Sequence, residues 1–355
     1  MTLYTAYGLT IRSELELPEL VVAPGCEHAD IEIRLGRVPC GEEASERPLA
    51  PGVWANRDSL RFQIPGTATY HARDGRTITI EPAAGSDDDS VRLFLLGSAF
   101  GALLFQRGAL ILHGSAIRVD DACLICLGPS GIGKFTLLAG FLQRGHQIVS
   151  DDVIAVDEGG RAIPGFPRVK LWQDAADRLG IQTGPLRRIR PELEKFNYPL
   201  GENFADRPWS VRWVYVLGSH EATDIRIEPL SGMRRLAPLR DNTYRAGFLK
   251  GLKLEAEHLR SCAKLANAVH LARVTRPRSG FDLNALIDRL LADASRHATP
   301  FGERGCWDRL GSCRQPDSAA DQEPHFMREN HQPAPNSGAD SVAALTSSRI
   351  RRGDR

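Results

Sequence analysis

Gly128-Pro129-Ser130-Gly131-Ile132-Gly133-Lys134-Phe135-Thr136 fits the pattern G-x-x-x-x-G-K of a phosphate-binding loop. In such a loop the glycines let backbone N–H groups point at phosphate oxygens, while the lysine reaches the outer phosphates. The stretch is therefore predicted to bind a nucleotide, with Lys134 also acting in catalysis. Phe135 departs from the pattern, because the residue after the lysine normally supplies a hydroxyl that binds magnesium.

The sequence around the loop predicts the elements that such a loop needs. Ala122 to Leu127 is an apolar strand, Lys134 to Arg144 a helix, and Gln147 to Ser150 a second strand. Ala109 to Leu112 is expected to form a further strand before them. The helix N-terminus would add its dipole to the cradle of amides, so this order of elements favours a nucleotide site over a glycine-rich turn.

Two aspartates, Asp151 and Asp152, follow the strand after the helix. In open α/β sheets the carboxyl ends of strands line the ligand crevice, which would bring both carboxylates to the rim that holds the loop. One could hold magnesium while the other accepts a proton from an attacking hydroxyl. The alternative is that the pair only marks a turn.

His113 ends the strand from Ala109, and the next residue is Gly114. That strand could neighbour the strand leading into the loop, and glycine permits close backbone approach. A role in acid or base chemistry and a purely structural role are both open for this histidine.

The composition excludes several partners. The 355 residues include 45 basic and 44 acidic side chains, which gives no reason to expect a nucleic acid or an anionic membrane. The longest apolar stretch, Leu93 to Phe105, is shorter than the about 20 residues that a bilayer requires. Residues 1–10 show no export signal, so a cytoplasmic location is expected.

The seven cysteines have no disulfide spacing. Cys123 and Cys126 form a C-x-x-C within the apolar strand that enters the loop. Core packing is the favoured interpretation, and a metal-thiol protein is the remote alternative. His325 and His331 lack partners at metal-ligand spacing.

The predicted fold class is α/β, divided into three parts. Residues 1–88 alternate apolar and polar in short runs and predict a small β-rich N-terminal domain. Residues 89–297 predict the loop-bearing catalytic domain, starting with a helix from Val91 to Arg107 and ending with one from Leu283 to Ala294. Residues 298–355 have the composition of a disordered tail.

These motifs resemble those of the HPr kinase/phosphorylase family of serine kinases. The resemblance rests on L-H-G-S at Leu112 to Ser115, the loop itself, R-G-H at Arg144 to His146 and S-D-D at Ser150 to Asp152. It implies a P-loop kinase domain related to PEP carboxykinase, with ATP and Mg²⁺ as cofactors. It also implies that Asp151 is the base for the substrate serine, that Asp152 assists with magnesium and that His113 lies beside the transferred phosphate.

Two departures modify these expectations. Phe135 removes a magnesium ligand, which leaves open a nucleotide-binding regulatory protein without transfer. In place of the family's L-E-I-R-G-L-G type signature stands a segment from Gly165 to Trp172. That segment and the N-terminal domain look more like kinase homologues found with ribosomal peptide clusters, some of which phosphorylate a lasso-peptide precursor. The expected partner is thus a peptide or protein bearing a serine, and a homo-oligomer stays open.

A basic run lies between Gly184 and Tyr198. Its members are Arg187, Arg188, Arg190 and Lys195. They could clamp a phosphate or an acidic peptide. A solvated loop is the favoured interpretation, because exposure is the ordinary state of these side chains.

Overall fold

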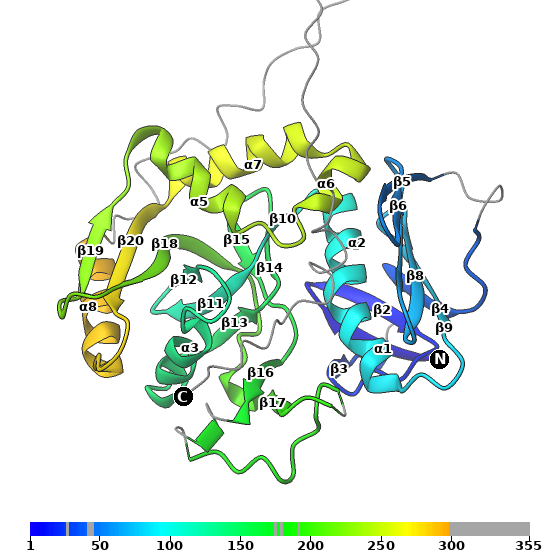
Figure 1. The fold of residues 1–355 in the computed structure, drawn as a ribbon, viewed down its shortest axis with the longest axis horizontal. Coiled ribbons are helices and arrows are strands. Elements are labelled where there is room, and N and C mark those ends of the chain that lie inside the picture. Colours follow the sequence, from blue (N-terminus) through cyan, green and yellow to red (C-terminus); the bar gives the residue numbers. More distant parts are fainter. Residues whose placement is uncertain (26–27, 41–45, 174–175, 178–179, 191, 298–355) are drawn as a thin grey trace, which may run out of the picture.

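The structure is a computed structural model that describes residues 1–25, 28–40, 46–173, 176–177, 180–190 and 192–297. Residues 298–355, predicted as a disordered tail, lie outside the described residues, as do His325 and His331 within them. Figure 1 shows two sheets on opposite sides of a long buried helix.

The first sheet is built from the N-terminal residues. Its described strands follow the order β3-β1-β2-β4-β9-β8-β7-β6-β5. Their bounds are β1 (Thr2–Ala6), β2 (Leu9–Ser13), β3 (Val21–Val22), β4 (Ile31–Leu35), β5 (Arg47–Ala50), β6 (Val53–Ala55), β7 (Ser59–Ile64), β8 (Ala68–Arg73) and β9 (Thr77–Pro82). Alternate residues such as Ile31 and Ile33 are buried, as expected for a strand with one face on a core. The predicted β-rich character of this region is therefore found.

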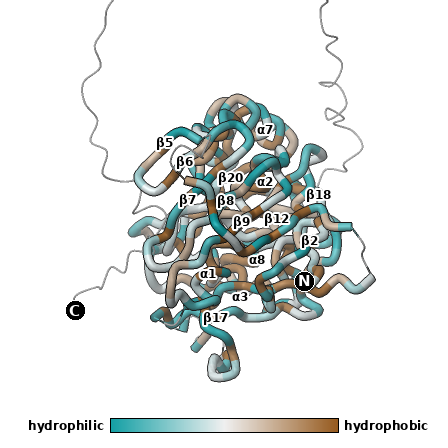
Figure 2. The backbone as a smooth tube through the Cα atoms, turned by 90° about the vertical axis from the view of Figure 1, so that its right-hand side faces the viewer, coloured by the Kyte–Doolittle hydropathy of each residue, from teal (hydrophilic) through white to brown (hydrophobic). Residues whose placement is uncertain are grey.

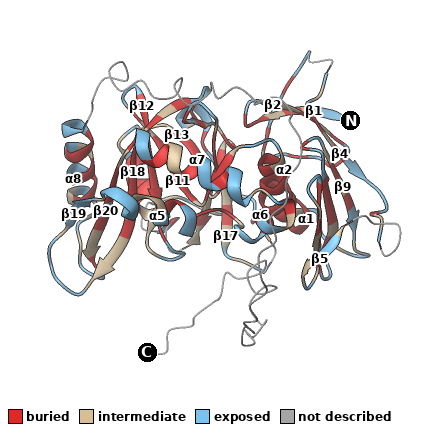
Figure 3. Cartoon of the chain, turned by 90° about the horizontal axis from the view of Figure 1, so that it is seen from above, coloured by how far each residue is buried: buried red, intermediate tan, exposed pale blue. Residues whose placement is uncertain are grey.

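The helix predicted from Val91 to Arg107 is present, with an irregular centre. It consists of α1 (Asp88–Phe94), a π-helical turn η2 (Leu95–Ala99) and α2 (Phe100–Gln106). It is almost wholly buried between the two sheets (Figure 3). Gly97 and Gly101 leave room for Tyr244, since a Cβ on either would lie 3.0 Å from that side chain. The widened turn and the two glycines thus let an aromatic ring pack directly on the helix.

The second sheet contains the loop. Its described strands follow the order β10-β14-β15-β18-β12-β11-β13, with β20 pairing β18 and β19 pairing β20. Their bounds are β10 (Leu110–Leu112), β11 (Gly114–Val119), β12 (Ala122–Leu127), β13 (Ile148–Asp151), β14 (Ile154–Val156), β15 (Arg161–Ile163), β18 (Trp209–His220), β19 (Arg226–Pro229) and β20 (His270–Pro277). Strand β11 lies between β12 and β13 and is antiparallel to both. β12 and β13 therefore point the same way and end at the same edge.

Helices cover both faces of this sheet (Figure 1). Leu137, on α3, and Ile287, on α8, belong to the core on one face, whereas Cys262, on α7, belongs to the core on the other. The remaining helical bounds are α3 (Lys134–Gln143), η3 (Gly201–Asn203), η4 (Gly232–Arg235), α5 (Leu236–Asp241), α6 (Gly247–Leu252), α7 (Glu255–Ala268) and α8 (Leu283–Arg296). The chain is thus a mixed α/β protein.

The two cysteines of the C-x-x-C motif lie on opposite faces of strand β12. Cys123 packs in the core under α7, and Cys126 packs in the core under α3 and α8. Both are free and fully buried. Residues three apart in a strand point to opposite faces, so the core-packing prediction is confirmed and the metal-thiol alternative is wrong.

Apolar stretches along the chain are short. Figure 2 shows brown and teal segments interrupting one another along the tube. Among the described residues, no helix combines the length and the apolar character needed to cross a bilayer.

A third sheet has only two strands and is called the hairpin below, although a long segment joins its strands. It consists of β16 (Arg168–Trp172) and β17 (Lys195–Pro199), paired antiparallel. It lies below β13 in Figure 1. β13 and β16 contact each other, which brings the hairpin next to the end of the strand that carries the acidic pair.

Candidate functional site

The glycine-rich loop joins β12 to α3, as predicted. Gly128, Gly131 and Gly133 have φ values of +148°, +81° and +99°, in the region that favours glycine. Pro129, Ser130 and Gly131 are exposed, and helix α3 begins at Lys134. The loop therefore has the strand before it and the helix N-terminus after it that phosphate binding requires.

Lys134 folds back over the loop. Its Nζ donates hydrogen bonds to the carbonyl oxygens of Gly128, at 2.6 Å, and Pro129, at 3.1 Å. Burial lowers the pKa of Lys134, and the negative charges of Asp152 and Asp151 oppose that shift. The charge of the loop lysine thus interacts with the charges of the acidic pair.

Asp151 is the last residue of β13, and its partner across the strand pair is Ser115 on β11. The Ser115 hydroxyl donates to Asp151 Oδ1 at 3.0 Å. Burial and the neighbouring charge of Asp152 raise the pKa of Asp151. A carboxylate whose pKa is raised is better suited to accept a proton near neutral pH.

Asp152 has a φ of +72°, which is uncommon for a residue other than glycine. Its Oδ2 accepts from Lys170 Nζ at 2.6 Å, and its Oδ1 lies 3.2 Å from His113 Nδ1. Burial opposes ionisation, but Lys170 and His113 outweigh it and hold the pKa of Asp152 well below its usual range. His113 Nδ1 also hydrogen-bonds the backbone O of Asp152 at 3.1 Å, so it lies between that oxygen and Oδ1. Asp152 is thus a charged carboxylate bound through Oδ2 by Lys170.

His113 lies between β10 and β11, next to Asp152. The strand that precedes it, β10, pairs with β14, whereas the strand that follows, β11, pairs with β12. The prediction that the preceding strand neighbours the loop strand is therefore wrong. Its physical reason is that β10 and β11 run on in one direction opposite β14 and β13, while the other edge of β10 is occupied by a different segment. There Leu112 bridges Thr243, and the N–H of His113 donates to Asn242 O at 2.7 Å. The histidine still reaches the acidic pair.

The hairpin β16–β17 supplies cations that the sequence analysis did not assign to the site. Lys170 binds Asp152, and its side chain is 16% exposed. Arg168 is 8% exposed; burial lowers its pKa, and the charges of Glu19, Asp152 and Asp151 oppose that shift. Lys195 lies 4.9 Å from the Trp172 ring centroid; burial and the charge of Lys170 lower its pKa. Period-two alternation places Arg168 and Lys170 on one face of β16, a signal present in the sequence.

The basic run thus divides into two parts. Lys195 is half-buried over the Trp172 ring, and the charges of Asp152 and Asp151 oppose the lowering of its pKa, so the solvated interpretation is wrong for this residue. Arg187, by contrast, has a 54% exposed side chain and pairs with Asp89 at 3.2 Å. Arg190 donates to Ser90 Oγ at 3.2 Å. The two arginines therefore join this segment to helix α1.

A pocket opens beside the acidic pair. Its lining residues come from η2, the end of β13 and the residues after it, and β16 with the residues before it; they are Leu96, Asp151, Asp152, Val153, Phe166, Arg168 and Lys170. Arg168 Nε is buried without a hydrogen-bond partner among the described residues. The pocket therefore offers carboxylates and cations on a partly apolar wall.

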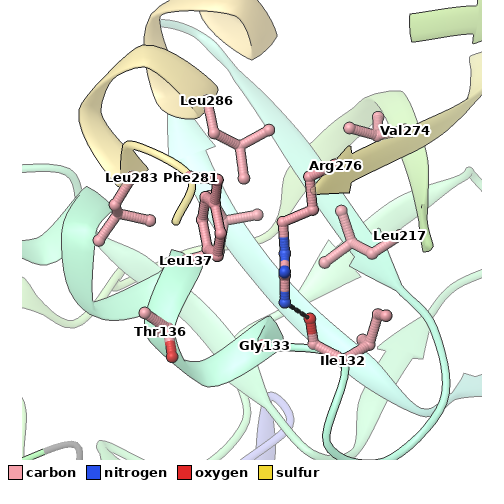
Figure 4. A pocket seen from close by; sticks show the side chains of 10 residues that line it. All are labelled: Ile132, Gly133, Thr136, Leu137, Leu217, Val274, Arg276, Phe281, Leu283 and Leu286. Carbon is pink, nitrogen blue, oxygen red and sulfur yellow. Dashed lines mark hydrogen bonds between the residues drawn. The ribbon is translucent and has the colours of Figure 1, made fainter. Parts of the chain in front are cut away.

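A second pocket lies between the start of helix α3, strand β20 and the start of helix α8, and is shown in Figure 4. Arg276 crosses it, donating from Nη2 to Ile132 O at 2.7 Å and lying 4.1 Å from the centroid of the Phe281 ring. Thr136 lines this pocket. Arg276 thus ties the loop backbone to β20.

The residues present do not fit the predicted magnesium site. Phe135 offers no oxygen and packs against the core that contains Leu137. Thr136, one position later, lines the other pocket. Oδ2 of Asp152 is bound by Lys170, and Oδ1 lies 3.2 Å from His113 Nδ1, which also hydrogen-bonds the backbone O of Asp152. The donor set that magnesium prefers is therefore incomplete.

One other group of side chains in the described part of the chain has the composition of a metal site. His270, Asp293 and His297 place ligand atoms within 4.8 Å of one another. Asp293 Oδ2 already accepts from Tyr215 Oη and from His270 Nε2, each at 2.9 Å. These hydrogen bonds satisfy the buried carboxylate of Asp293 and join α8 to β18 and β20, so the group is explained by the packing of α8 on the sheet.

A segment of 71 residues is 32% identical to the HPr kinase/phosphorylase of Clostridium beijerinckii, which is 20% of this chain and 24% of that protein. The chain is related in sequence to the HPr kinase/phosphorylases. The HPr kinase/phosphorylase of Chlorobium phaeovibrioides is 33% identical over 51 residues, 14% of this chain and 15% of the relative. The chain thus spans less than a quarter of the length of these relatives. No protein-family model matches it.

The HPr(Ser) kinase/phosphatase of Coxiella burnetii, a solved structure, aligns with 52% of this chain and 95% of its own. The aligned residues are 13% identical and the TM-score is 0.25, too low for a comparison of the two folds. The resemblance to HPr kinases therefore rests on the sequence match.

Proposed function

We propose that the chain is an ATP-dependent serine kinase of the HPr-kinase-like group, acting on a peptide or protein hydroxyl. The observation that carries this proposal is the meeting of a glycine loop, its lysine and an acidic pair at one sheet edge. The relatives named HPr kinase/phosphorylase support the same reaction class. With ATP as donor, we place the reaction in the cytoplasm.

In the proposed reaction, Asp151 accepts the proton of the serine hydroxyl. The serine oxygen then forms a bond to the γ-phosphorus of ATP, and the bond from that phosphorus to the β,γ-bridging oxygen breaks. ADP leaves with the electron pair of that bond, and the products are phosphoserine and ADP. The raised pKa of Asp151 supports its part as the base.

Lys134 and the loop amides would bind the phosphates, and Asp152 with His113 would hold the edge of the site in place. We derive no step through magnesium, because the residues present do not complete its site. A precursor of a lasso peptide is one candidate acceptor, consistent with the segment from Gly165 to Trp172.

Phe135 favours a second candidate, a nucleotide-binding regulatory protein without transfer. The substitution Phe135→Ser restores a hydroxyl at that position. A large gain of transfer would support a damaged kinase, whereas ATP binding without transfer in either form would support the regulatory protein.

The test is ATP binding and phosphate transfer to serine-containing peptides by the wild-type chain, Lys134→Ala and Asp151→Asn. We expect the lysine variant to lose binding and the aspartate variant to bind ATP without transfer. Lys250→Met, an exposed lysine on α6, is the matched control and is expected to match the wild type. The absence of ATP binding in the wild type would refute both candidates.

A further inference from the structure

We propose that Lys170 takes the place of a magnesium ion in this site, so that ATP binds without a divalent cation. The inference rests on the proposed function and concerns how the same site handles the charge of the nucleotide.

Asp152, the carboxylate expected to assist with magnesium, is held by two side chains. Here the Lys170 ammonium lies 2.6 Å from Oδ2, and His113 Nδ1 lies 3.2 Å from Oδ1. Lys170 is mostly buried, with 16% of its side chain exposed, so the pair is held at close range and little screened by solvent. The position of the metal ligand is thus filled by a fixed positive charge.

The second step is the missing hydroxyl. The loop normally supplies one oxygen to magnesium through the residue after its lysine, and here that residue is Phe135. Its ring packs against the core with Leu137 and Leu138. Both protein ligands expected for magnesium are therefore weakened. The hydroxyl after the loop lysine is absent, and the Asp152 carboxylate is paired with Lys170.

The third step is the charge around the pocket. The lining itself has two cations, Arg168 and Lys170, and two carboxylates, Asp151 and Asp152. Lys134 and Lys195 also interact with the charges of both aspartates. Glu19 interacts with the charge of Arg168, but it is paired with Arg92 at 3.2 Å. The cations around the two aspartates therefore exceed the carboxylates, which is unfavourable for a further cation and favourable for the oxygens of a triphosphate. Arg168 lines the pocket, more than nine-tenths buried, and its Nε is without a hydrogen-bond partner in the described part of the chain. A phosphate oxygen is the kind of acceptor that such a guanidinium binds.

In this proposal Lys170 pairs first with Asp152 alone and then, once ATP binds, with both Asp152 and the phosphates. Without nucleotide it neutralises Asp152, and with nucleotide it lies between the carboxylate and the phosphates, as a metal ion would. The charge of the metal is replaced by side chains of the hairpin β16–β17.

The experiment is titration of the wild-type chain with ATP, followed by calorimetry, in excess MgCl₂ and in excess EDTA. We expect the two dissociation constants to agree within about threefold, well under the 1.4 kcal/mol that a tenfold change represents. Lys170→Met is expected to lose about tenfold in EDTA, as the loss of a charge-assisted hydrogen bond predicts. Magnesium should restore part of that affinity, because Asp152 Oδ2 is then free.

Lys170→Arg keeps the charge and is expected to bind ATP equally in both buffers, whereas Lys250→Met should resemble the wild type. Circular dichroism of each variant reports folding. A wild-type chain that loses tenfold or more in EDTA would overturn this inference and leave the proposed kinase intact. Failure of the wild type to bind ATP in either buffer would overturn both.

Discussion

Gly114→Ala is expected to destabilise the protein and to disturb the acidic pair. A Cβ on Gly114 would lie 2.5 Å from Cys126 O, 2.9 Å from Leu127 Cδ2 and 3.1 Å from Ile154 Cδ1. The nearest atom is backbone of the central strand β12, which cannot move without breaking its pairing. Forcing an extra methyl group into a packed core costs about 1–3 kcal/mol, and this contact predicts the upper end of that range.

The substitution would also reach the site. Gly114 O accepts the N–H of Asp152 at 2.8 Å, and the next residue, Ser115, donates to Asp151. Displacing β11 from β12 therefore shifts both aspartates relative to the loop. We expect phosphate transfer to fall more than ATP binding, because the loop lies on the strand that stays in place.

The assay is urea denaturation followed by fluorescence, with Gly247→Ala as the control. Gly247 opens helix α6, and a Cβ there would meet nothing within 4 Å. That change is expected to be neutral or to stabilise by up to about 1 kcal/mol, the difference between glycine and alanine in a helix. Equal stability of Gly114→Ala and wild type would refute the packing argument.

Three further predictions concern the site and its supports. Asp151→Asn should lower transfer by about 10²–10⁴-fold at unchanged ATP affinity, as loss of a general base does. The pKa of Asp151 is raised, so this base becomes protonated at a higher pH than an ordinary carboxylate. The rate of transfer by the wild type should therefore fall as the pH is lowered, with a midpoint above the usual pKa of an aspartate, and a pH profile checks this. Arg276→Ala should weaken ATP binding by about tenfold, since a charged hydrogen bond to Ile132 O is lost. Tyr7→Phe should cost about 1 kcal/mol of unfolding free energy, because the buried hydroxyl donates to Val153 O at 3.0 Å.

Each of these three has a result that contradicts it. Asp241→Asn, which changes an exposed aspartate, is the control for Asp151→Asn. An equal loss of transfer in both variants would show that Asp151 is not the general base. Arg273→Ala changes an exposed arginine on the same strand as Arg276, so equal affinities for the two variants would contradict the loop contact. For Tyr7, a phenylalanine variant as stable as wild type would show that the hydrogen bond contributes nothing.

The neighbourhood of the loop was predictable from sequence because it is local. The predicted strand Ala122 to Leu127 matches β12, and the predicted helix and following strand match α3 and β13 within one residue at each end. The apolar run forms the strand, the three glycines allow the backbone conformation of the loop, and the lysine begins the helix whose N-terminus faces the loop. The acidic pair was placed correctly at the same edge because β12 and β13 run in the same direction.

The cations of the hairpin could not be predicted in the same way. Lys170 and Lys195 are separated by more than twenty residues, and only the antiparallel pairing of β16 with β17 joins them. The carboxylates that they interact with, Asp151 and Asp152, are the last residue of β13 and the residue after it, in a different sheet. The same holds for Tyr244, which packs on α1–α2 through two glycines whose purpose is invisible in the helix pattern. Tertiary contacts, not propensities, set these positions.

The first sheet and the loop-bearing sheet share one apolar core. One buried cluster joins residues of the first sheet, such as Ile31, to Ile111 on β10 and Ala155 on β14, and it includes Val153 and Phe166 beside the acidic pair. Tyr7, which follows β1, contacts both of these residues: its hydroxyl donates to Val153 O, and its ring lies edge-on to Phe166. A fragment that keeps the loop-bearing sheet and lacks the first sheet would therefore uncover the apolar wall beside the acidic pair.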